Sequence, residues 1–199
     1  MAAIPRGLDD LILDAIVARL NVVASAEEAE DPALGWTTTR NKSRPWEAAE
    51  LRTGPLVNCW IPNVDPVREG SSSRRLSMFE AQYHIECYTR GVETVGGPTA
   101  DQDAADRLVH LKQQVAYGLF DMAWTNWGLA TTGVIGKFDW PRWETLQNEQ
   151  YQMEDQIIAG RWRLSIQYVW EPADIDLPDL EALGVTDTDR FAALYDYTG

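Results

Sequence analysis

The sequence is poor in the residues on which many catalytic and metal sites depend. Its 199 residues include two cysteines, two histidines and three lysines. Cys59 and Cys87 are separated by 27 residues, which fits neither a disulfide framework nor the close cysteine pairs that bind metals. Uninterrupted apolar runs reach only four or five residues, whereas a membrane-spanning helix needs about 20. We therefore expect no disulfide framework, no cysteine metal site and no membrane span.

Positive charge is also scarce. The chain carries 17 basic and 31 acidic side chains, which gives a formal net charge of −14. A molecule of this charge repels phosphate polyanions, which argues against nucleic-acid or anionic-membrane binding as a primary task. The N-terminus, MAAIPRGLDDLIL, lacks the basic region and apolar block of a secretory signal. We expect a single globular domain that is made and kept in a cytoplasm-like compartment.

Helical periodicity marks two segments of the chain. Between Leu8 and Leu20, apolar residues recur at steps of three and four, which predicts an amphipathic helix. Thr99 and Gln102 fit a capping box, so a second helix is expected from there to about Met122. Residues 24–55 lose this periodicity and are predicted to form an irregular connection, which at this length is usually functional or part of an interface.

Alternation of apolar and polar residues predicts the strands. The two strongest are residues 77–90 and 161–170. A short strand over 56–61 is expected to end at Pro62, and another running from Gly133 toward Trp140 is expected to end at Pro141. Residues 143–158 are ambiguous. The order of elements predicts an α+β fold, with an antiparallel or mixed β-sheet and two helices packed on one of its faces.

Two polar segments are predicted in addition to these helices and strands. Residues 63–75 predict a long, protruding loop arm that carries the main basic cluster, Arg68, Arg74 and Arg75. This cluster is either a solvated loop or an ion-pairing contact to an acidic neighbour, such as another copy of the chain. The 29 residues from Glu171 carry eight acids and one arginine, interleaved with apolar residues. We therefore expect one domain over residues 1–172 and an acidic C-terminal extension, residues 173–199, that docks on neighbours.

A search for catalytic and binding motifs finds little. Neither a phosphate-binding loop nor a GxGxxG turn is present. His84 and His110 belong to no sequence motif of a catalytic nucleophile or a metal site. They are interpreted as residues on the polar face of a strand and of a helix, respectively. The many pairs of carboxylate side chains are interpreted as solvated surface residues. The residue spacing of a calcium-binding loop is absent. We predict no catalytic residue, no cofactor and no metal ion.

Tryptophan is unusually frequent, with nine residues against three lysines. Trp162 and Trp170 lie on one strand face and are expected in the core. Trp124 and Trp127, like Trp140 and Trp143, lie beside glycine or proline at element ends. Core packing and subunit contact both remain open for these four, because aromatic residues concentrate in the centres of interfaces. Trp124 and Trp127 are therefore candidate interaction residues, together with the three arginines of the arm.

Several segments together resemble the tail terminator, or tail completion, family of long-tailed phages. These are the first helix and the segments GPLVNCWIP, SSSRRLSMFEAQYHIECYTR, ADQDAADRLVHLKQQVAYGLF and GRWRLSIQYVWEP. The resemblance covers residues 7 to 172. It lies in the order of the predicted helices and strands and in the general pattern of residues within them. Residues 24–55 and the acidic segment from Glu171 are extra to the family's minimal pattern.

The resemblance implies a structural virion protein, not an enzyme. It implies a hexameric ring that caps the tail tube and joins it to the head-side connector, after assembly in the host cytoplasm. Its partners would be other copies of the chain, the tail tube protein and the connector, with genomic DNA passing the acidic lumen without specific binding. The alternatives are a head-completion or connector subunit, a small-ligand binding module with an aromatic pocket and, last, a hydrolase using a carboxylate pair.

Overall fold

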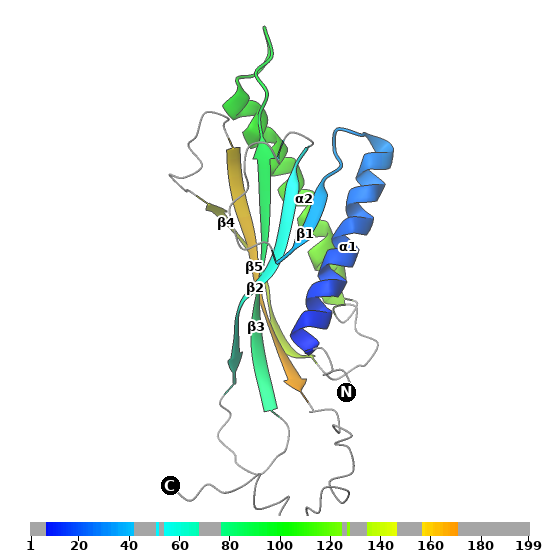
Figure 1. The fold of residues 1–199 in the computed structure, drawn as a ribbon, viewed down its shortest axis with the longest axis vertical. Coiled ribbons are helices and arrows are strands. Elements are labelled where there is room, and N and C mark those ends of the chain that lie inside the picture. Colours follow the sequence, from blue (N-terminus) through cyan, green and yellow to red (C-terminus); the bar gives the residue numbers. More distant parts are fainter. Residues whose placement is uncertain are drawn as a thin grey trace, which may run out of the picture.

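The chain folds into two helices and five strands over the residues that the computed structural model describes, which are 7–41, 51, 54–67, 77–124, 127, 135–146 and 157–170 (Figure 1). The element bounds are α1 Leu8–Glu30, β1 Thr37–Arg40, β2 Leu56–Pro66, β3 Ser77–Arg90, α2 Ala100–Trp124, β4 Ile135–Leu146 and β5 Ile157–Trp170.

The five strands form one mixed sheet in the order β1-β2-β3-β5-β4. β1 runs parallel to β2, and all the other neighbours are antiparallel. β3 and β5 pair along their whole length, from Ser77 opposite Trp170 to Arg90 opposite Ile157. The sheet is therefore built around the two segments with the strongest alternation in the sequence.

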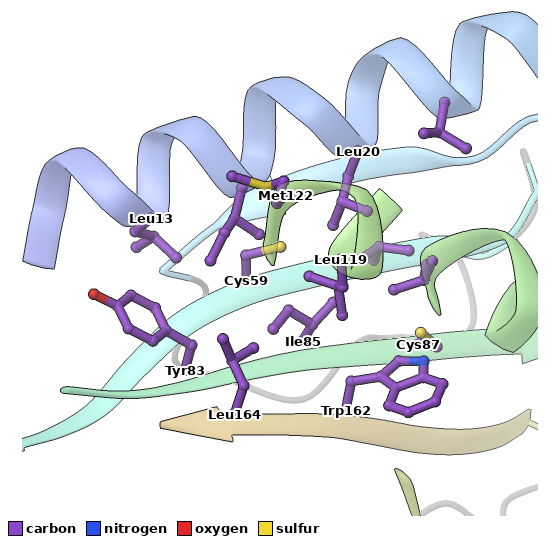
Figure 2. Packing of buried hydrophobic residues seen from close by; sticks show 14 of the residues in the cluster. Leu13, Leu20, Cys59, Tyr83, Ile85, Cys87, Leu119, Met122, Trp162 and Leu164 are labelled. Atoms are coloured by element: carbon purple, nitrogen blue, oxygen red, sulfur yellow. The ribbon is translucent and has the colours of Figure 1, made fainter. Parts of the chain in front are cut away.

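Both helices pack on the same face of this sheet, which confirms the predicted fold class (Figure 2). Alternate side chains of each strand point to that face because the period of a strand is two. The core they form with the helices includes Leu13 and Leu20 of α1, Leu119 and Met122 of α2, Cys59, Tyr83, Ile85 and Cys87 of the middle strands, and Trp162 and Leu164 of β5.

The predicted capping box at the start of α2 is present. The Thr99 backbone N–H donates to Gln102 Oε1 at 3.2 Å, and the Gln102 N–H donates to Thr99 Oγ1 at 3.4 Å. These bonds satisfy donors that the first turn of a helix leaves unpaired. The helix then continues to Trp124, close to its predicted end.

The prediction of an irregular connection over residues 24–55 was wrong in part. α1 continues to Glu30, because Val23 and Ala24 extend the buried stripe and the acidic residues that follow face solvent. Thr37–Arg40 forms β1, whose four residues lack an apolar alternation and take their strand conformation from pairing with β2. Residues 42–50, 52 and 53 lie outside the described residues.

The prediction that Pro62 and Pro141 end their strands was also wrong. β2 runs on to Pro66 and β4 to Leu146, and the pairing register shifts at each proline, between Trp60 and Asn63 and between Asp139 and Arg142. Proline is tolerated at bulges and on edge strands, where its missing N–H breaks no ladder. β4 is an edge strand, and β1 pairs β2 only as far as Cys59.

Candidate functional site

The face of the sheet turned away from the helices is only partly covered by described residues, and we call it the open face. The strand register arranges its side chains in cross-strand rows. At one end a small apolar cluster closes the face, made of Leu51, Leu56, Tyr88 and Ala159, with Leu146 and Ile157 packed against it. The rows beyond this cluster are polar.

The next row holds an ion pair between the buried Glu86 and the partly buried Arg161. Arg161 of β5 donates through Nε and Nη2 to Glu86 Oε1, at 3.1 and 2.7 Å, and the Tyr88 hydroxyl donates to Glu86 Oε2 at 2.7 Å. Glu144 of β4 accepts longer contacts, 3.3 Å from Arg161 and 3.4 Å from Arg163. Glu86 is therefore held by three donor groups, whereas Arg163 shares a single carboxylate with Arg161.

The row after it contains His84, which is 8% exposed. Its ring meets the Trp60 ring edge-on, with centroids 5.1 Å apart, and neither ring nitrogen has a hydrogen-bond partner among the described residues. Burial, together with the nearby Arg161 and Arg163, lowers the pKa of His84 to about 4. The imidazole is neutral at pH 7, with one donor and one acceptor nitrogen to offer.

A hollow of about 400 Å³ opens beside His84, where the β4 bulge separates that strand from β5. Its lining is mixed in charge and includes Glu80, Gln82 and His84 of β3, Asp139, Trp140, Arg142, Trp143 and Glu144 of β4, and Arg163, Leu164 and Ser165 of β5. Hydrogen bonds from Ser165 and Gln167 lower the pKa of Glu80, so that carboxylate is ionised and already engaged.

On the helix side, the same β4 edge carries an aromatic row that we call the aromatic edge. The Phe138 ring lies 5.6 Å from Trp127 and 5.3 Å from Trp140, and Trp140 lies 5.5 Å from Phe120 of α2. Trp127 is 1% exposed, whereas Phe120 is 38%, Trp140 49% and Tyr117, one helical turn before Phe120, 65% exposed. The row thus leads from the core to the surface.

The predicted interaction residues are only partly placed. Arg68, Arg74 and Arg75 lie outside the described residues, as do the side chain of Trp124 and the whole extension 173–199. Trp127 belongs to the core cluster, which favours core packing over subunit contact for this residue. Trp140 is the exposed member of the group, and the sequence signal for it is its place immediately before Pro141 in an edge strand.

The cysteine thiols and the possible metal-ligating side chains can be described among the placed residues. Burial raises the pKa of both cysteine thiols well above the ordinary value, so neither is a reactive thiolate at neutral pH. Among these residues, no group of three or more histidine, cysteine, aspartate or glutamate side chains is arranged to hold a metal ion. Neither α1 nor α2 is apolar enough over its length to cross a membrane.

Comparison with known proteins adds no assignment. No protein-family model matches the chain, and no curated protein matches it in sequence. The surfaces described above are therefore the features of the chain that bear on its function.

Proposed function

We propose that the chain is a ring-forming structural subunit of a phage tail, of the terminator type that caps the tail tube and meets the head-side connector. The observation that carries this proposal is the aromatic edge. Trp140 and Phe120 expose 49% and 38% of their surface at the outer end of an aromatic row that begins at the buried Trp127, and a cluster of this kind is typical of the centre of a protein interface.

The shape of the β4 edge supports a contact through side chains. The pairing of β4 with β5 is irregular around Pro141, which has no backbone N–H, and a bulge and a proline on an edge strand discourage continuous pairing with a strand of another chain. Trp140, Phe120 and Tyr117 expose the side-chain surface through which such a contact would form. If that neighbour presents a different surface, the contact is head-to-tail, and such a contact forms a ring when the rotation between successive copies closes.

The predicted hexamer, its place in the virion and its contacts with the tail tube protein and the connector come from the family resemblance. A head-completion or connector subunit of the same neck would use the same kind of contact. A small-ligand binding module is the other candidate, favoured by the hollow on the open face, whose volume lies within the range of ligand pockets.

The test is the mass of the purified full chain by native mass spectrometry over a concentration series, with and without the tail tube protein. We expect a closed oligomer that the substitution Trp140→Ala dissociates, because a half-exposed aromatic ring at an interface centre contributes about 2 kcal/mol or more. Val95→Ala is the matched control, since Val95 is a fully exposed apolar residue outside the aromatic edge. A 22.4 kDa monomer under every condition would contradict the proposal.

A further inference from the structure

The outward side of α1 is uncharged and largely apolar, although the helix belongs to a strongly acidic chain. Leu11 is 42% and Val22 58% exposed, and they lie three turns apart on the same side of the helix, about 16 Å along its axis. We call this side the α1 face. Its other exposed residues within the described structure are small: Ala18, Ser25, Ala26 and Ala29.

The two charged residues between Leu11 and Ala26 are both turned to other elements. Asp14 pairs with Arg40 of β1 at 3.1 Å, and Arg19 pairs with Asp121 of α2 at 3.0 Å. A surface helix normally carries its charged residues opposite the core, whereas a helix that is apolar all round is normally buried. The sequence of α1 therefore fits a helix that is covered on its outward side as well.

Charge decides which surface of this chain suits the α1 face of another copy. α1 carries six acids against one arginine, a net charge of −5, so two α1 helices packed together would repel each other. Residues 171–199, with eight acids and one arginine, would meet the same repulsion. The aromatic edge does not, because β4 carries two acids and two bases, and α2 carries one of each from Lys112 onward.

The α1 face and the aromatic edge belong to opposite ends of the sheet. α1 contacts β1 and β2, whereas the aromatic edge lies at β4, the last strand at the other end of the strand order (Figure 1). One copy thus has one apolar surface for each of two neighbours. Two different surfaces on one subunit are what a head-to-tail contact requires.

We propose that the aromatic edge of one copy packs on the α1 face of the next, with Trp140 and Phe120 lying against Val22 and the small residues around it. The large rings of one surface complement the small side chains of the other, as the close packing at the centre of an interface demands. This inference rests on the proposed function, because it names the surface that the aromatic edge meets.

Two variants that each damage one surface provide the test. Val22→Glu places a charge in the α1 face, and Trp140→Ala removes a ring of the aromatic edge. Each should raise the concentration at which half of the chain is assembled by about tenfold or more, since a buried unpaired charge and a lost aromatic anchor both weaken a contact strongly. Val95→Glu is the matched control, because Val95 is a fully exposed valine outside both surfaces.

Mixing the two variants shows whether the damaged surfaces meet each other. A Val22→Glu copy keeps its aromatic edge and a Trp140→Ala copy keeps its α1 face, so together they form one intact contact and no ring. Native mass spectrometry with one variant ¹⁵N-labelled should show dimers with one copy of each, at a concentration where each variant alone is monomeric. Ala18→Glu charges the same face and keeps the test valid if Val22→Glu does not fold by circular dichroism.

Four results would overturn the inference. If Val22→Glu and Ala18→Glu assemble like the wild type while Trp140→Ala does not, the aromatic edge meets another surface, and the ring-forming role stands without this inference. A mixture without mixed dimers would show that the two surfaces do not meet. A wild-type chain that stops at a dimer would exclude the head-to-tail contact. A wild-type monomer under every condition would overturn both the inference and the proposed function.

Discussion

Gly160 of β5 is a position in the sheet whose packing leaves no room for a Cβ atom. A Cβ atom built there would lie 2.1 Å from Cζ2 and 2.5 Å from Cη2 of Trp143, its neighbour on the helix side of the sheet. Carbon atoms in normal contact are about 3.5–4.0 Å apart, so Gly160→Ala forces the indole ring to move by more than about 1 Å. The ring is confined by Trp162, with centroids 5.4 Å apart, and by the Lys112 ammonium.

We therefore expect Gly160→Ala to lower the free energy of unfolding by about 1–3 kcal/mol, the usual cost of overpacking. For a chain of this length, each kcal/mol corresponds to about 2–4 °C in melting temperature. The assay is urea unfolding followed by far-UV circular dichroism. Trp143→Leu removes the clashing atoms, so the double variant should lose clearly less stability than the sum of the two single variants. Additive losses, or a Gly160→Ala effect below about 0.5 kcal/mol, would refute this reasoning.

Two further predictions concern the open face. The pKa of His84 is about 4 in the folded chain and about 6.5 when unfolded, so the unfolded state binds the extra proton and stability falls as the pH drops through that window. Between pH 7 and 4.5, His84→Gln should lose less stability than the wild type, by at most about 3 kcal/mol. Parallel stability curves for the two proteins would contradict this. Glu86→Ala leaves the partly exposed Arg161 guanidinium with only its longer contact to Glu144, and we expect a loss of about 1.5–3 kcal/mol in urea unfolding. Adding Arg161→Met should recover most of that loss, and no recovery would mean that the charge pair is not the cause.

The sequence by itself determined the elements whose signals are local. The bounds of β3 were predicted residue for residue, and the strict alternation of apolar and polar side chains over residues 79–87 leaves one assignment of faces. The start of α2 followed from its capping box, whose hydrogen bonds join residues three apart. Two strong strands and two amphipathic helices were enough to predict the α+β class with both helices on one face of the sheet.

Only the tertiary structure decided the elements that depend on a distant partner. β1 is a strand because β2 pairs with it, and β4 passes Pro141 because an edge position needs no N–H on its outer side. The hollow and the aromatic edge follow from the pairing register, which places Arg142 opposite Arg163 and brings Trp140 to Phe120 of α2. Contacts between residues far apart in the chain depend on how whole elements pack, and no local pattern records that packing.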